Sequence, residues 1–196
     1  MPKAFFFYIY ALMFKKIAEF DERVSRYWFF HRFSPKVDKW LRFYTRLGDG
    51  YVWALVIIFI VWNSGISFLG NVLVQVLASL AVSLAAYWAI KLLARRKRPF
   101  EVIEGFQALV PPLDKFSFPS GHTMNNLAVA STLFLSVPVA GALMMALPLT
   151  WGLLRVYFGV HWLTDVIGGF CLGILSFLLG HLIWLYLLEP HFLCLS

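Results

Sequence analysis

Two ionisable side chains near residue 160 have the spacing of a catalytic pair. His161 and Asp165 are four residues apart, so on a helix they lie on one face within hydrogen-bonding reach. A carboxylate that holds one ring nitrogen fixes the tautomer and leaves the other nitrogen basic, which is the arrangement used in nucleophilic catalysis. Considered alone, the cluster is explained equally well by a structural His–Asp pair.

A second polar cluster, Pro119-Ser120-Gly121-His122, opens an apolar segment. Ser120 can cap the helix that follows, and Gly121 lets a ligand approach the backbone closely. The free N–H groups and the dipole at such a helix terminus attract anions. An ordinary N-cap accounts for Ser120 and Gly121, but it leaves an ionisable His122 at the mouth of a membrane span unexplained.

A third cluster is basic and ends another apolar segment. Lys91, Arg95 and Arg98 are spaced by four and three residues, so they line one stripe of a helix. Taken alone, this stripe is more typical of an anchor at the lipid headgroups than of a binding site. Together with Arg155, however, it supplies cations that suit a phosphate group.

The three clusters together indicate metal-free phosphoryl transfer. Cations and backbone N–H groups would stabilise the equatorial oxygens, one histidine would attack phosphorus, and the other would protonate the leaving group. No group of cysteine, histidine and carboxylate residues has the spacing of a closed metal site. We therefore expect neither a metal ion nor a cofactor.

The elements that position these clusters are predicted to cross a membrane. The 196-residue chain is 61% hydrophobic and 14% charged, with a mean hydropathy of +0.75, whereas soluble domains carry about 25% charged residues. A proline-rich loop at 99–119 is not expected to be helical. The predicted apolar spans are 51–69, 72–93, 120–137, 139–158 and 163–188.

The N-terminal part has a different composition. Residues 4–14 are apolar, but as a helix they measure about 16 Å, which is too short to cross a bilayer. Residues 15–46 mix charged and aromatic side chains, as helices at a membrane interface do. Gly48-Asp49-Gly50 then breaks the chain, and Asp49 is predicted to be a turn or cap residue.

We accordingly expect one all-α domain over residues 1–196. Residues 1–50 would form an N-terminal interfacial segment, and residues 51–188 a polytopic catalytic core, giving five to six transmembrane helices in all. Following the spans through the bilayer places all three polar clusters on one membrane face. The net charge of +7 is explained by basic flanks facing anionic lipid, and no soluble basic domain exists to bind nucleic acid.

The three clusters resemble the signature of the type 2 phosphatidic acid phosphatase family. Its pattern is Lys-x6-Arg-Pro, then Pro-Ser-Gly-His, then Ser-Arg-x5-His-x3-Asp. All three parts occur here in order across residues 91–165, with Lys91 to Pro99 matching the first part. One departure is Leu154, which stands where the family usually has serine; we expect it to tune the activity.

The resemblance implies a role for each matched residue. His161 would be the nucleophile that forms a phosphohistidine, Asp165 would orient it, and His122 would be the general acid for the leaving group. The phosphate would be held by Lys91, Arg98, Ser120, Gly121 and Arg155. A weaker hypothesis is that nearby basic residues recognise a second phosphate or a headgroup; these are Arg95, Arg96, Lys97 and Lys115.

The resemblance also implies a lipid substrate taken from the bilayer. Candidates are phosphatidylglycerol phosphate, phosphatidic acid, an isoprenyl pyrophosphate and the 1-phosphate of lipid A. The alternatives are a vanadate-dependent haloperoxidase, whose known examples are larger soluble proteins, a transporter or channel for anions, and an inactive relative that only binds lipid or anions. A transporter would carry polar residues along several spans, whereas here they gather at one end.

Two indications of membrane orientation conflict. Every charged loop lies on the polar face, so the positive-inside rule places that face in the cytoplasm. Members of the resembled family generally act on the outer or lumenal side, and several of the basic residues would bind phosphate. We favour a protein of a bacterial cytoplasmic (inner) membrane with its site on the periplasmic face.

Overall fold

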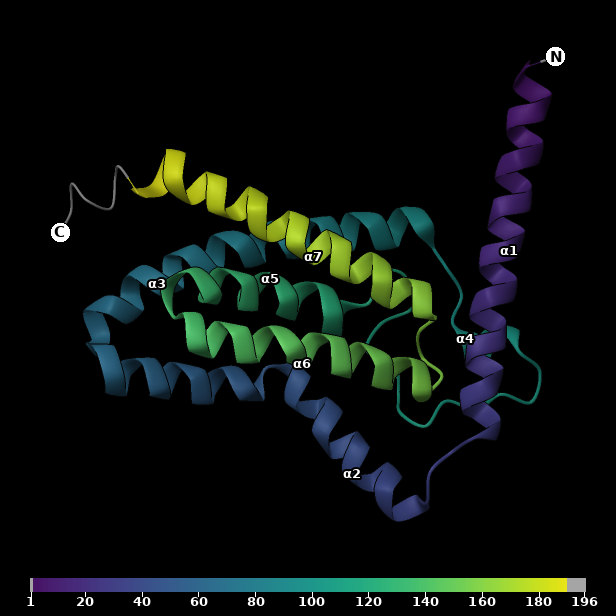
Figure 1. Cartoon of the computed structure of the whole chain (residues 1–196), viewed down its shortest axis with the longest axis horizontal. Coiled ribbons are helices and arrows are strands. Elements are labelled where there is room, and N and C mark those ends of the chain that lie inside the picture. Colours follow the sequence, from purple (N-terminus) through teal and green to yellow (C-terminus); the bar gives the residue numbers. More distant parts are fainter. Residues whose placement is uncertain (1, 190–196) are drawn as a thin grey trace.

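The computed structural model describes residues 2–189, and every regular element in that range is helical (Figure 1). The long helices are joined by short links, apart from an irregular stretch that follows α4. The elements are α1 (Pro2–Phe30), α2 (Pro35–Arg46), η1 (Leu47–Asp49), α3 (Tyr51–Ala94), α4 (Pro99–Val102), α5 (Gly121–Ser136), α6 (Pro138–Tyr157), α7 (Leu163–Ile183) and η2 (Trp184–Leu188). The all-α prediction is therefore confirmed.

Helix α3 is folded back on itself at Gly65. This residue has φ 80° and ψ 171°, a conformation that glycine adopts freely and that residues with a Cβ atom rarely adopt. The two limbs, residues 51–64 and 66–94, diverge from this turn, so both ends of α3 reach back toward the same end of the bundle (Figure 1). We had predicted the break at 69–71, and its position was wrong because Gly65, not Gly70, makes the turn.

Helix α5 lies at the centre of the bundle, in contact with α3, α6 and α7. Its Leu127 and Ala128 are fully buried. On α7, Gly173 allows a close approach, because a Cβ there would lie 2.7 Å from the carbonyl oxygen of Met124. Small residues at such contacts are how membrane helices pack without polar partners. The close packing fixes the beginning of α5 against the middle of α7.

Three helical segments in the described range are long and apolar enough to cross a membrane: Tyr51–Val102, Pro138–Tyr157 and Leu163–Leu188. The first includes both limbs of α3. Helix α5 has only 16 residues, or about 24 Å, and its surroundings are other helices. Our expectation of five to six membrane helices, with a single domain over the whole chain, stays a prediction.

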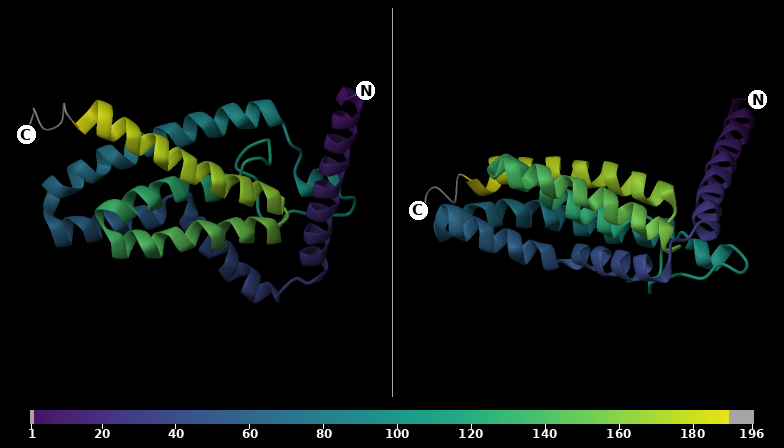
Figure 2. Two further views of the ribbon diagram at one scale, coloured as in Figure 1. Left: turned by 45° about the horizontal axis from the view of Figure 1, so that its top comes forward. Right: turned by 60° about the horizontal axis from the view of Figure 1, so that its bottom comes forward.

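Helix α1 lies across the end of the bundle instead of running along it (Figures 1 and 2). Phe29 stacks on Phe106 with 4.6 Å between ring centroids, and Trp28 meets Tyr157 edge-on at 5.8 Å. The charged half of α1 is thus fastened to the loop after α4 and to the end of α6. A crosswise helix that joins apolar and charged halves is compatible with the predicted interfacial segment.

Helix α2 connects α1 to the bundle. Ser34 caps its first turn, with Oγ accepting from the N–H of Val37 at 3.5 Å, and Pro35 occupies the first helical position. Asp38 is buried and accepts a 2.5 Å hydrogen bond from the hydroxyl of Tyr157. This contact ties α2 to α6 and delivers the chain to η1, beside the polar end of the bundle.

Candidate active site

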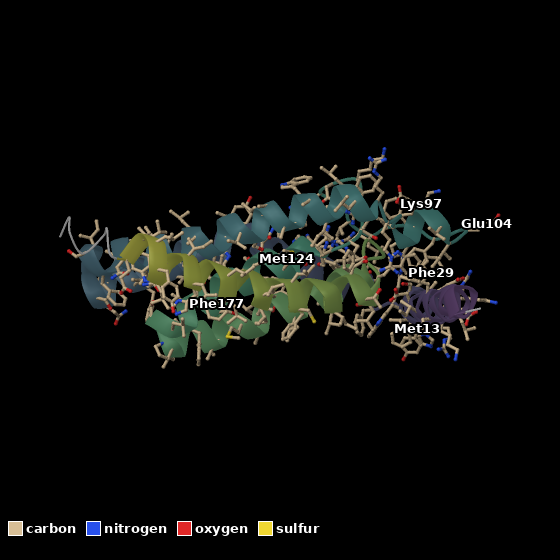
Figure 3. All side chains as sticks on the ribbon, turned by 90° about the horizontal axis from the view of Figure 1, so that it is seen from above. Met13, Phe29, Lys97, Glu104, Met124 and Phe177 are labelled. Carbon is tan, nitrogen blue, oxygen red and sulfur yellow. The ribbon has the colours of Figure 1, made fainter. Side chains whose placement is uncertain are left out.

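The polar side chains gather where α1 crosses the bundle. In Figure 3, Lys97, Glu104 and Phe29 lie at this end, whereas Met124 and Phe177 lie further along the bundle. A cavity of about 820 Å³ begins there. The predicted site residues that border it are Arg98, Gly121, His122, Arg155 and His161. Residues from three separate parts of the sequence are therefore brought to one cavity.

His161 lies in the link between α6 and α7, and Asp165 lies in the first turn of α7. Oδ2 of Asp165 accepts a 2.8 Å hydrogen bond from the N–H of Trp162, which caps the helix. The same oxygen lies 3.5 Å from Nδ1 of His161, a contact that is out of line for a hydrogen bond. Both side chains are buried, so Nε2 of His161 is the nitrogen left to react.

Burial governs the charge of His161. It lowers the pKa of the His161 ring to about 4, although Asp165 favours the charged form. An imidazole with this pKa is neutral at physiological pH and carries a free lone pair. A neutral ring held beside a carboxylate has the properties of a nucleophile or a base.

Asp165 has a second cationic partner that the sequence did not indicate. Nη1 of Arg96 lies 2.6 Å from Oδ1 of Asp165, and Nη2 lies 2.6 Å from Oδ2 of Asp21 on α1. Asp21 is completely buried and also accepts from the N–H of Thr164 at 3.0 Å. Arg96 is therefore held by two buried carboxylates, and its part in headgroup recognition stays a hypothesis. Arg95, its neighbour, is exposed.

Arg155 differs from Lys91 and Arg98 because no described side chain forms an ion pair with it. It borders the cavity and is 4% exposed. Its Nε is buried and has no hydrogen-bond partner, and no described side chain (residues 12–189) forms an ion pair with its guanidinium. A buried cation without a counterion is unfavourable unless an anion arrives. The site therefore contains a place for an anion.

Lys91 and Arg98 are already neutralised in this structure. Both are 1% exposed and both form ion pairs with Oδ1 of Asp114, in the Arg98 case at 2.9 Å. Tyr87 donates to the other oxygen of the same carboxylate at 2.5 Å. Burial alone would raise the pKa of Asp114, but the hydrogen bonds from Lys91 and Tyr87 and the two positive charges hold that pKa below its usual range.

The beginning of α5 brings Gly121 and His122 to the cavity, but not Ser120. Ser120 is fully buried and is not among the residues that line the cavity. It occupies the N-cap position, but its side chain does not form the capping hydrogen bond that we expected from the sequence. Its N–H donates to the carbonyl of Asp165 at 3.1 Å. Ser120 therefore links α5 to α7 behind the predicted phosphate site.

Asp49 belongs to the site, although we had predicted only a turn or cap residue. Its Oδ1 lies 2.9 Å from Nε2 of His122, and it borders the cavity. Contact with the His122 ring holds the pKa of the Asp49 carboxyl below its usual range, so the group is ionised. The available signal was an acidic residue between two glycines at the edge of a span, in a chain with only ten acidic residues.

Leu154 does not border the cavity. It packs against an apolar cluster formed by Tyr157, Phe158 and Val160, together with the loop residues 108–110. The side chain therefore supports the loop that carries Asp114 and leaves the cavity wall unchanged.

Most of the remaining cavity lining is apolar, apart from Asn125 and Asn126. Its walls come from both limbs of α3 and from α5, and they include Ile60, Leu69, Val76 and Val129. The helix between Leu69 and Tyr87 is about 27 Å long, so the cavity follows the bundle for most of a bilayer's thickness. Among the described residues, no group of three histidine, cysteine or acidic side chains could hold a metal ion.

Comparison with known proteins identifies the family and the fold of the chain. Residues 72–189 match the family model described as the PAP2 superfamily. The chain is 32% identical to an undecaprenyl-diphosphatase of Sulfolobus acidocaldarius over 135 residues, 67% of this chain and 63% of that protein. It spans less than two thirds of the length of the curated relatives it matches.

Two solved structures share the fold. One is the transmembrane PAP2 type phosphatidylglycerolphosphate phosphatase from Bacillus subtilis, with a TM-score of 0.65 and 28% identity over 90% of this chain and 91% of that one. The other is LpxE of Aquifex aeolicus, with a TM-score of 0.66 and 24% identity over 81% of this chain and 93% of that one. The second likeness concerns the fold alone.

Proposed function

This chain belongs to the PAP2 superfamily, and from that premise we propose that it is a metal-independent phosphatase of membrane lipids with His161 as its nucleophile. One observation carries the proposal. Arg155, a buried arginine with no ion-pair partner among the described side chains, borders the same cavity as the neutral ring of His161. A phosphate group supplies the missing anion and the electrophile in one molecule.

In the first step, Nε2 of His161 attacks phosphorus and the bond between phosphorus and the leaving oxygen breaks. Asp165, 3.5 Å from Nδ1 of His161, stabilises the positive charge that forms on the ring. Arg155 and Arg98 stabilise the equatorial oxygens. His122 gives a proton to the leaving oxygen, so the products are a phosphohistidine and an alcohol or a lipid monophosphate.

In the second step, water attacks the phosphohistidine and His122 takes the proton of that water. The bond between Nε2 and phosphorus breaks, and inorganic phosphate leaves with the electron pair returned to His161. Lys91 adds positive charge to the phosphate site, which its ion pair with Asp114 partly offsets in the free protein. Ser120 and Gly121 hold the beginning of α5 in place at the phosphate.

The apolar cavity supports a lipid as the substrate. A water-soluble phosphate ester needs only the polar end, where Arg155 and His161 lie. The walls between Ile60 and Val129 offer nothing to such a substrate but suit a hydrocarbon chain. Lipid phosphates with one or more long chains therefore fit both halves of the cavity.

The candidate substrates are those expected from the sequence: phosphatidylglycerol phosphate, phosphatidic acid, an isoprenyl pyrophosphate and lipid A 1-phosphate. The names of the similar proteins include both a diphosphatase and a phosphatidylglycerolphosphate phosphatase, so a panel must cover monoesters and diphosphates. We further propose that the protein lies in a bacterial inner membrane with the site on the periplasmic face.

The test is phosphate release from this panel by purified protein in EDTA. We expect turnover with at least one lipid, inhibition by vanadate, and a loss of at least about a thousandfold in kcat for His161→Ala. An acid-labile phosphoryl label on the wild-type protein, absent from the variant, identifies the intermediate. Dependence on a divalent metal ion, wild-type activity of the variant, or binding without turnover would each contradict the proposal.

The orientation is tested separately. A single cysteine at Glu104, in a chain whose two native cysteines are replaced, should react with an impermeant reagent in intact spheroplasts. Glu104 is exposed at the polar end of the molecule (Figure 3). Labelling only after the membrane is broken would place the site in the cytoplasm and leave the phosphatase proposal intact.

A further inference from the structure

His122 has a carboxylate partner of its own. Oδ1 of Asp49 lies 2.9 Å from Nε2 of His122, while Oδ2 of Asp165 lies 3.5 Å from Nδ1 of His161. Each histidine at the cavity is thus paired with one aspartate, and the two aspartates come from opposite ends of the sequence. The three sequence clusters include the pair His161 and Asp165, but they do not include Asp49.

The segment that carries Asp49 is built against His122. The carbonyl of Gly48 accepts a 3.0 Å hydrogen bond from Nδ2 of Asn126, whose Oδ1 accepts from Nε1 of Trp53 at 2.7 Å. A Cβ on Gly48 would lie 2.9 Å from the ring of Trp151 and 3.0 Å from Cδ2 of His122. The backbone is therefore clamped in contact with the ring, which explains why glycine precedes Asp49.

The two ring nitrogens of His122 are in different surroundings. Nε2 is buried and faces Asp49, at a contact whose alignment is too poor for a hydrogen bond. The residue nevertheless borders the cavity. Because Nε2 is covered, Nδ1 is the nitrogen left for a substrate. Catalytic hydrogen bonds are often poorly aligned before the substrate binds and tighten afterwards.

We propose that Asp49 is a positioning residue that keeps the proton on Nε2 of His122 and so makes Nδ1 the group that exchanges protons with the substrate. The inference rests on the proposed phosphatase function. In the first step Nδ1 gives its proton to the leaving oxygen, and the ring becomes neutral with Nε2 still protonated. In the second step the free Nδ1 takes a proton from water, which restores the starting state.

Burial disfavours the charged form of the His122 ring, and three charged groups act on it from the elements around it: Asp49 of η1, Arg155 of α6 and Asp114 of the loop after α4. Arg155 opposes the charged form of the ring. Asp114 is already paired with Lys91 and Arg98. Of the two carboxylates, Asp49 is the one that contacts the ring, and no described lysine or arginine lies at ion-pair distance from it.

The test compares Asp49→Asn with the wild-type protein on two substrates. Phosphatidic acid has an alcohol as its leaving group and needs a proton, whereas p-nitrophenyl phosphate releases a stable anion and does not. For Asp49→Asn at pH 8 we expect kcat/KM to fall by about tenfold or more with phosphatidic acid and less than about twofold with p-nitrophenyl phosphate. In the pH profile of kcat/KM for phosphatidic acid, the alkaline limb of Asp49→Asn should lie about one pH unit lower than that of the wild-type protein.

Two further variants complete the experiment. Asp49→Glu keeps the charge and should recover most of the activity. Glu104 is an exposed carboxylate at the same end of the molecule, and Glu104→Gln should leave kcat/KM unchanged for both substrates. Equal losses on both substrates, or a wild-type profile for Asp49→Asn, would overturn the inference. A wild-type protein that releases phosphate from none of the four panel lipids would instead remove the proposed function itself.

Discussion

At the scale of single residues, burial sets the reactivity of His161. An exposed histidine has a pKa of about 6.5, but burial lowers the pKa of His161 to about 4. Only the neutral ring can attack phosphorus. The nucleophile therefore stays in its reactive form as the pH falls through 6.5, and it is lost only as the pH approaches 4.

This gives a prediction for the pH profile. After correction for the ionisation of the substrate, kcat/KM should remain nearly constant from pH 7 down to about pH 5, and its acid limb should lie near pH 4. The measurement is a series of initial rates with phosphatidic acid in detergent. An acid limb near pH 6.5 would mean that the reacting histidine is exposed.

The sequence pattern identified the residues that are proposed to carry out the reaction, but it missed three carboxylates. Arg155 and His161 were recognisable because they are close in sequence and match a spacing. Asp21, Asp49 and Asp114 have partners 75, 73 and 23 residues away, so no local period connects them. Their contacts depend on how the helices pack, which composition and spacing do not determine.

At the scale of elements, the divergent limbs of α3 give the cavity its apolar walls. A substitution that fills this space should affect a long lipid and spare a small phosphate ester. Val76 borders the cavity, whereas its neighbour Leu77 is 58% exposed on the outer side of the same limb. The two positions differ by one residue in the same helix.

We therefore expect Val76→Trp to lower kcat/KM for a long-chain lipid phosphate by about tenfold or more, because the added ring occupies the space of a hydrocarbon chain. Hydrolysis of p-nitrophenyl phosphate should change little, and Leu77→Trp should leave both rates near wild type. Equal effects on the two substrates would show that the cavity does not hold the lipid chain.

The elements also show what a hydropathy pattern leaves undecided. The apolar segment around residues 60–75 contains two glycines, and either could end a span. Only the backbone shows that Gly65 has a positive φ while Gly70 remains helical. The existence of the spans was predicted because their composition is distinctive, whereas the turn between two of them was misplaced because its signal was ambiguous.

At the scale of the whole molecule, Arg96 joins α1 to the bundle. It lies 2.6 Å from Asp21 and 2.6 Å from Asp165, and both carboxylates are completely buried. Removing the arginine leaves two buried negative charges near each other. Arg95, the preceding residue, is exposed and its Nε donates only to the carbonyl of Leu92, so it offers a matched comparison.

We expect Arg96→Gln to lower the free energy of unfolding in detergent by about 3–5 kcal/mol and to reduce kcat, because Asp165 loses a partner that holds it in place. Arg95→Gln should change the unfolding free energy by less than about 0.5 kcal/mol. Denaturant titrations of both variants provide the measurement. Similar stability for the two would mean that α1 is not fastened through this network.

The position of Asp21 and Asp49 has a consequence for how the boundaries of this protein are drawn. The family match begins at residue 72, after both carboxylates. A fragment trimmed to the matched region would retain both histidines and every cation of the signature, yet it would lack the support of Asp165 by α1 and the partner of His122. The region that matches the family is therefore shorter than the part of the chain that builds the proposed site.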